Sequence, residues 1–148
     1  MSTVSETISP RLREIIEDFS SCEGQAKLKL LLEYAERMPA LPDRILKGKN
    51  DLDQVDDCTT SVFVHVEADR ARKLRFYFDV PTESPTVRGF AAILEDGLRC
   101  VTPEQVLSIP EDFYLQMELH QVLSPQRMQG MAAVLRQMKN LASEIAAN

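Results

Sequence analysis

The sequence predicts an α+β domain in which a small antiparallel sheet of two to three strands packs against several helices. Two stretches of alternating apolar residues lie near the middle of the chain, and stretches with helical apolar spacing flank them on both sides. The length of 148 residues is typical of one domain and is enough to bury a core. We therefore expect a single domain over residues 10–148, after a polar and flexible N-terminal tail of residues 1–9.

Two amphipathic helices are predicted before the sheet. Ser9 suits the N-cap of the first helix and Pro10 its first position. Gly24 separates this helix from the second, which we expect to end near Met38, before a surface loop through Asn50. The apolar stripes consist of Leu12, Ile15, Ile16 and Phe19 in the first helix and Leu28, Leu31, Leu32 and Ala35 in the second. Charged residues of the second helix, including Lys27, are expected outside its stripe.

Period-two alternation predicts paired strands from position 62 onward. The residues expected on one face are Val62, Val64 and Val66 in the first strand and Leu74, Phe76 and Phe78 in the second. The link from Ala68 to Arg72 is short enough for an antiparallel hairpin, although it lacks an Asn-Gly pair. Residues 52–55 are predicted to add a brief third strand.

The C-terminal half is predicted to be helical because three Ser/Thr-Pro pairs precede stretches of helical period. They are Ser84-Pro85, Thr102-Pro103 and Ser124-Pro125. The helix after Ser124 is expected to be the longest. Its apolar stripe is Met128, Met131, Val134, Leu135, Met138, Leu141 and Ile145.

Charge and hydropathy exclude several classes of function. The chain carries 17 basic and 23 acidic residues, so it lacks the basic surface that nucleic acid binding requires. No apolar run approaches the roughly 20 residues that cross a bilayer, and residues 1–10 lack the features of a secretory signal. We expect no membrane association and a cytoplasmic location.

The cysteines give the most informative signal in the chain. Cys22, Cys58 and Cys100 are odd in number and widely spaced, so a disulfide framework is not expected. Cys58 lies where a polar, turn-forming segment runs directly into the alternating strand, and a thiol there is a candidate nucleophile. An apolar wall for it would come from residues such as Phe63 and Phe90. The residues alone leave the alternative of an inert, small side chain at a strand edge.

Three further segments resemble the SufE family in order and spacing. Met38-Pro-Ala-Leu-Pro42 is similar to the family's proline-rich exit from its second helix, and Cys58 follows at the family's distance. The segment from Phe78 to Gly89 is similar to the family's strand, acidic turn and Val-Lys/Arg-Gly helix. The segment from Leu123 to Gly130 is similar to the Leu-Ser/Thr-Pro-x-Arg-x-x-Gly opening of its last helix. The resemblance extends over residues 19–139 and implies a SufE/IscU-like fold.

The resemblance implies a sulfur carrier and activator without independent turnover. Cys58 would take sulfane sulfur as a persulfide from a SufS-type cysteine desulfurase and deliver it to a SufB-containing scaffold. It also implies no cofactor and no metal of the protein's own, and it leaves a homodimer open. The chain departs from the family pattern at Asp57 and Thr60, where Gly and Ser are usual. The Asp57 carboxylate beside the sulfur should disfavour the thiolate electrostatically.

Other residues at family positions are candidates for binding the partner or supporting the loop. Arg88 and Arg127 occupy basic positions, and a guanidinium could pair with partner carboxylates or hold the domain together. Glu83 occupies the acidic turn, where it could equally stabilise the start of the next helix. His65 and His120 are expected to be structural rather than catalytic.

Two alternatives remain open from the sequence. An IscU-like iron–sulfur scaffold would bring the three cysteines to one metal site, whereas we expect Cys22 and Cys100 to be packing residues. A non-catalytic interaction module or regulatory binding protein of the same fold would use the methionine stripe of the last helix as a partner surface. We expect that stripe to lie in the core.

Overall fold

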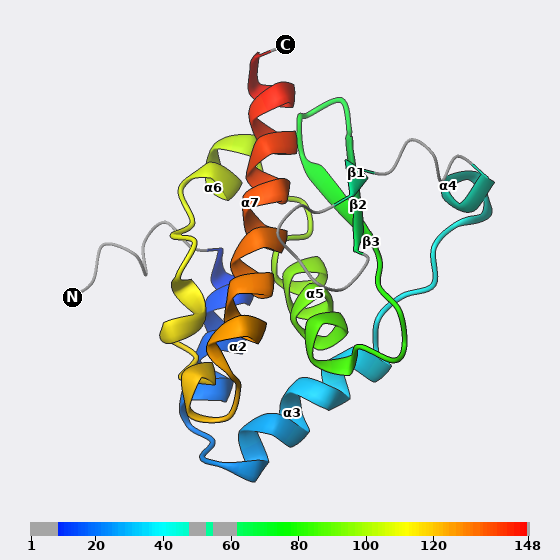
Figure 1. The fold of residues 1–148 in the computed structure, drawn as a ribbon. Helices are drawn as coiled ribbons and strands as arrows, with labels where there is room; N and C mark the ends of the chain where they lie inside the picture. The colour runs from blue at the N-terminus through cyan, green and yellow to red at the C-terminus, as the bar shows by residue number, and fades with distance from the viewer. Residues whose placement is uncertain (1–8, 48–52, 55–61, 148) are drawn as a thin grey trace.

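The computed structural model describes residues 9–47, 53–54 and 62–147, and it confirms the α+β class. Helices surround one central helix and cover one side of a small sheet (Figure 1). In chain order the elements are α2 (Pro10–Ser20), α3 (Gln25–Glu36), α4 (Asp43–Lys47), β1 (Asp53–Gln54), β2 (Phe63–Ala68), β3 (Leu74–Asp79), α5 (Pro85–Gly97), α6 (Pro103–Leu107), two short 3-10 turns (Phe113–Leu115 and Leu119–Gln121) and α7 (Pro125–Ala147).

The helix starts lie at the predicted Ser/Thr-Pro pairs. The Ser9 hydroxyl accepts a hydrogen bond from the Leu12 backbone N–H at 3.3 Å and donates one to the Gly97 carbonyl at 2.6 Å, so it caps α2 and ties it to the end of α5. Thr102 and Gln105 form a reciprocal capping box at the start of α6. These side chains fix the helix ends because they satisfy backbone N–H groups that have no partner inside the helix.

The sheet has the order β1-β2-β3 with both pairs antiparallel. The predicted brief third strand is confirmed as β1, where Asp53 pairs with Val64 and Gln54 with Phe63. In the hairpin turn, the Asp69 carboxylate accepts backbone N–H bonds from residues 71 and 73 at 2.8 and 2.9 Å. An aspartate therefore closes the turn in place of an Asn-Gly pair.

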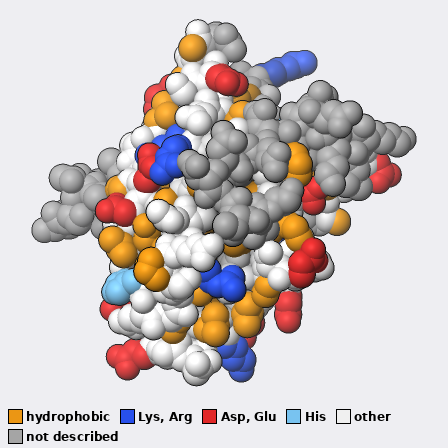
Figure 2. All heavy atoms as spheres, viewed as in Figure 1, with side chains coloured by type: hydrophobic (Ala, Val, Ile, Leu, Met, Phe, Trp, Pro, Cys, Tyr) orange, Lys and Arg blue, Asp and Glu red, His pale blue; other side chains and the backbone are white. Residues whose placement is uncertain are grey.

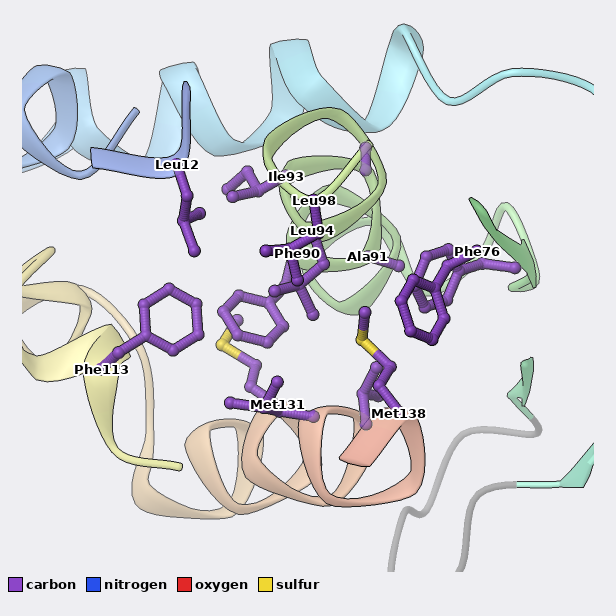
Figure 3. Packing of buried hydrophobic residues seen from close by; sticks show 14 of the residues in the cluster. Leu12, Phe76, Phe90, Ala91, Ile93, Leu94, Leu98, Phe113, Met131 and Met138 are labelled. Atoms are coloured by element: carbon purple, nitrogen blue, oxygen red, sulfur yellow. The ribbon is translucent and has the colours of Figure 1, made fainter. Parts of the chain in front are cut away.

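Helix α5 forms the centre of the core. It packs against α2, α3, α7 and β3, and most of its side chains are buried. Figure 3 shows Phe90 of α5 facing Phe113, with Met131 and Met138 of α7 on another side of the same cluster. The ring centroids of Phe90 and Phe113 lie 5.6 Å apart. Both of these methionines are fully buried, which confirms that the α7 stripe belongs to the core.

Helix α3 is rotated relative to the prediction. Its core face consists of Lys27, Leu31, Tyr34 and Ala35, whereas Leu28 and Leu32 are only half-buried. The prediction that Lys27 lies outside the core is wrong. Its ammonium donates to the carbonyl of Phe19 and, at 3.0 Å, to that of Met117, and this pairing makes a buried cation tolerable.

The predicted surface loop before the sheet also needs correction, because α4 interrupts it. The short helix is fixed by Ile45, which is buried, and by Arg44. The Arg44 guanidinium makes two hydrogen bonds to the Glu67 carboxylate and reaches the Tyr77 hydroxyl at 3.4 Å, across the outer face of the sheet. Among the described helices, none is long and apolar enough to cross a bilayer.

Candidate functional site

Cys58, Asp57 and Thr60 lie outside the described residues, so the site is defined by what surrounds their place in the chain. Gln54, the last residue of β1, pairs directly with Phe63, the first residue of β2. The described parts of the chain before and after residues 55–61 therefore meet at the same end of the sheet.

The same end of the sheet carries the second SufE-like segment. Phe63 pairs with Asp79, the last residue of β3, so the turn that follows β3 begins beside the start of β2. In this turn the Ser84 N–H donates to the Pro81 carbonyl at 3.1 Å, and α5 starts directly after it. The apolar residues at this end, Val62, Val64, Phe78 and Val80, are buried.

Arg88 joins three elements at this end. Its Nη1 donates to the Val80 carbonyl at 2.7 Å and its Nε to the Ala35 carbonyl at 3.3 Å. The side chain is half-buried and links the first turns of α5 to the end of β3 and the end of α3. Of the roles weighed from the sequence, these contacts favour support of the turn, because the guanidinium points into the fold at backbone acceptors.

Arg127 joins the first turn of α7 to the first turn of α5. Its Nη1 donates to the Thr86 hydroxyl at 2.8 Å, and Thr86 is buried whereas Arg127 is exposed. A guanidinium has five N–H donors. Most of them stay accessible to a partner, since the described residues provide one hydrogen bond for this side chain.

Glu83 is exposed in the turn before α5. The Thr82 hydroxyl lies 3.5 Å from its Oε2, at the limit of a hydrogen bond. No cation among the described residues forms an ion pair with Glu83, so its charge faces solvent at this end of the molecule.

Thr86 is the site residue that sequence reasoning missed. It is the buried acceptor for Arg127, and the sequence signal for it is a hydroxyl residue in the first turn after Ser84-Pro85. Arg127 thus ties the third SufE-like segment to the second, and Arg88 ties the second to the last turn of α3, directly before the first segment.

The other two cysteines lie elsewhere. Cys22 is partly buried after α2, with its thiol donating to the Asp18 carbonyl at 3.3 Å. The prediction that Cys100 is a packing residue is wrong, because it is exposed, in a left-handed turn with φ of 59°. The reason is a tertiary contact: the Cys100 N–H donates to the Leu74 carbonyl at 3.1 Å, and Val101 bridges to the same residue at the start of β3.

The cysteine positions bear on the scaffold alternative. Ser9, at the start of α2, contacts the end of α5, close to Cys100, whereas Cys22 follows the far end of α2. A helix of 11 residues is roughly 16 Å long, so Cys22 and Cys100 are too far apart to share one metal ion. Across the described ranges, no three His, Cys, Asp or Glu side chains gather as a metal site.

Two carboxylates that pair with arginine have lowered pKa values. The Arg44 guanidinium lowers the pKa of Glu67, and His65, 3.4 Å from the same carboxylate, lowers it further. The Arg11 guanidinium lowers the pKa of Asp96. His65 is half-buried on the outer face of the sheet, which agrees with the structural role predicted for it. His120 is exposed.

The family comparison defines the class of protein, one associated with iron–sulfur metabolism. Residues 13–142 match the family model SufE, described as an Fe-S metabolism associated domain. The chain belongs to the SufE family.

Three relatives illustrate the similarity. A SufE-like protein of Mycobacterium tuberculosis is 38% identical over 142 residues, which cover 96% of this chain and 98% of that protein. The cysteine desulfuration protein SufE of Wigglesworthia glossinidia brevipalpis is 23% identical over 129 residues, 86% of each chain. The solution structure of a hypothetical protein from Thermus thermophilus superposes with a TM-score of 0.83 at 33% identity, covering 95% of this chain and 99% of that one. Family membership supports a role in cysteine desulfuration for iron–sulfur cluster assembly.

Proposed function

We propose that the protein accepts sulfane sulfur on Cys58 from a SufS-type cysteine desulfurase and passes it to a SufB-containing scaffold. The observation that carries this proposal is the junction at one end of the sheet. There Phe63 pairs with both Gln54 and Asp79, the turn of Glu83 follows Asp79, Arg88 links the start of α5 to the ends of β3 and α3, and Arg127 links α7 to the first turn of α5.

The chemistry is a thiol–persulfide exchange with no net redox change. The Cys58 thiolate attacks the outer sulfur of the desulfurase persulfide, a new S–S bond forms on Cys58, and the S–S bond on the desulfurase breaks. The desulfurase cysteine leaves as a thiolate. The scaffold's thiolate then takes the sulfur from Cys58 in the same way. The rate depends on the thiolate fraction and on access to the sulfur, so the protein needs no cofactor of its own.

Asp57 should slow this exchange. A carboxylate next to the sulfur repels the negative charge of the thiolate, so the fraction of reactive thiolate falls. We expect Asp57→Gly to raise the rate of Cys58 alkylation by iodoacetamide in the isolated protein. An unchanged or lower rate in the variant would reject this electrostatic explanation.

The turnover rate of the desulfurase provides an assay for sulfur acceptance by this protein. Removal of its persulfide frees it for another turnover, so the protein should stimulate alanine formation from cysteine. Cys58→Ser should abolish this stimulation, whereas Cys22→Ser and Cys100→Ser are matched controls that should retain it. Equal stimulation by Cys58→Ser and the wild type would refute the proposal.

The reaction takes place in the cytoplasm, within one domain of residues 10–148 that follows a tail of residues 1–9. The Cys58 thiol, the desulfurase persulfide and the scaffold thiol are the only reacting groups in the proposed exchange.

A further inference from the structure

The rotation of α3 leaves two of its leucines only half-buried, at the edge of the core. Leu28 and Leu32 are one helical turn apart; Leu28 packs against the core from its edge, and Leu32 borders Pro85 and Arg88 at the start of α5. Neither has a function in the sulfur-accepting site described above.

These leucines line two adjoining hollows. One, of about 430 Å³, is lined by Leu32, Ala35, Glu36, Thr82, Pro85 and Arg88. The other, of about 440 Å³, is lined by Gln25, Leu28, Lys29, Leu32, Glu33 and Glu36. Because both contain Leu32 and Glu36, they form a single groove, which we call the α3 groove. Figure 2 shows hydrophobic side chains along the lower part of the molecule, where α3 lies, with both acidic and basic side chains beside them.

The rim of the α3 groove is acidic toward its α5 end. Glu33 and Glu36 are exposed, and neither forms an ion pair with a cation among the described residues. Glu83 adds a third exposed carboxylate next to Thr82. Arg88 lies at this end, but its guanidinium is directed at the backbone carbonyls of Ala35 and Val80. The cation at the opposite end is Lys29.

We infer that the α3 groove binds an amphipathic helix of the sulfur donor, with apolar side chains at i and i+4 and Lys or Arg residues opposite Glu33 and Glu36. The spacing of Leu28 and Leu32 forms a ridge of the kind that packs between side chains of a second helix. The 12 residues of α3 give the groove a length of roughly 18 Å, which matches a partner helix of about three turns.

One end of the α3 groove lies close to the place where sulfur transfer is proposed. This end is formed by Thr82, Pro85 and Arg88, which lie in the turn after β3 and the first turns of α5, and β3 ends beside Phe63 at the end of the sheet where Gln54 is paired. A donor helix bound there would hold the desulfurase beside the acceptor thiol. The inference rests on the proposed sulfur-accepting function, because it assigns this surface to the same donor.

Binding kinetics of the desulfurase to immobilised full-length protein test the inference. The double variant Glu33→Lys/Glu36→Lys should lower the association rate about tenfold at low salt, and the difference should largely disappear at high salt. Leu28→Ala/Leu32→Ala should raise the dissociation rate about tenfold at either salt concentration. Leu107→Ala is the control, because it truncates an exposed leucine on α6 outside the groove. Thermal unfolding of each variant verifies that it is folded.

A second readout separates this inference from the proposed function. Persulfide formation on Cys58, measured in single turnover at saturating protein, should be the same in the groove variants and the wild type. Groove variants that bind the desulfurase as the wild type does would overturn the inference, even if Cys58 still accepts sulfur. Conversely, if Cys58 accepts no sulfur but the groove variants weaken binding as expected, the proposed function fails while the groove stays a donor-binding surface.

Discussion

Gly89 provides the sharpest test of how the SufE-like segment of α5 stabilises the fold. A Cβ added at this position would lie 2.3 Å from the Leu31 carbonyl oxygen. Ordinary contacts of a Cβ start at 3.4 Å. The obstacle is a backbone atom of α3, so no rotation of a side chain can relieve the clash, and Gly89→Ala must push α3 and α5 apart.

The expected loss of stability in Gly89→Ala follows from two opposing effects. Overpacking of a close-packed core costs typically 1–3 kcal/mol, and a shift of about 1 Å between two core helices belongs at the upper end. Alanine regains about 1 kcal/mol because it favours the helix over glycine. We expect Gly89→Ala to lower the free energy of unfolding by about 2 kcal/mol, which corresponds to roughly 4–8 °C in Tm.

Urea unfolding followed by circular dichroism measures this loss. Gly97→Ala is the control on the same helix: its added Cβ meets the Leu12 side chain at 2.8 Å and the nearest backbone atom, the Leu12 Cα, only at 3.1 Å, so it should lose less stability. A Gly89→Ala protein as stable as the wild type, or a Gly97→Ala protein that is the less stable of the two, would refute the close-approach explanation.

Three further substitutions test side-chain contacts that hold elements of the fold together. Arg88→Ala should lower the free energy of unfolding in urea by about 1–3 kcal/mol, because the Val80 carbonyl loses the guanidinium donor and the Ala35 carbonyl keeps only backbone N–H donors; an unchanged free energy of unfolding would contradict this supporting role. Asp96→Asn should destabilise the protein at pH 7, and the difference from the wild type should shrink as the pH falls below about 4. The reason is that Arg11 lowers the folded-state pKa of Asp96. The ionised carboxylate therefore stabilises the folded protein above its unfolded-state pKa, and this stabilisation is lost on acidification. A stability difference between variant and wild type that does not change with pH would contradict this. Lys27→Met should lower Tm because two buried carbonyls lose a charged donor, whereas Lys29→Met, exposed on the same helix, should leave it nearly unchanged; equal Tm values for both variants would exclude the buried role.

Local sequence signals account for most of the fold. The hydroxyl residues before Pro10 and Pro103 mark real helix starts, because capping depends on neighbouring residues alone. Period-two alternation likewise identifies β2 and β3, since one face of their sheet is buried.

The rotation of α3 could not be read from the sequence. Leucines occupy positions 28, 30, 31 and 32, so the apolar pattern covers more than half of the helix circumference and does not fix which side faces the core. The choice is made by tertiary contacts: Gly89 admits the backbone at Leu31, and two distant carbonyls accept the ammonium of Lys27.

The candidate site was predictable only in part for the same reason. Family-like spacing identified Arg88 and Arg127 as candidate residues, but their partners are a backbone carbonyl after β3, another in the last turn of α3, and the hydroxyl of Thr86. Such long-range contacts leave no periodic signal. The exposure of Cys100 depends on a left-handed backbone conformation, which is uncommon for a residue with a Cβ and which local propensity does not indicate.

Mass spectrometry of the protein after incubation with a SufS-type desulfurase and cysteine tests the central claim most directly. We predict a gain of one sulfur atom on the peptide that contains Cys58, reversible by a thiol reductant and absent from Cys58→Ser. A protein that gains no sulfur, or gains it on Cys22 or Cys100 instead, would contradict the account.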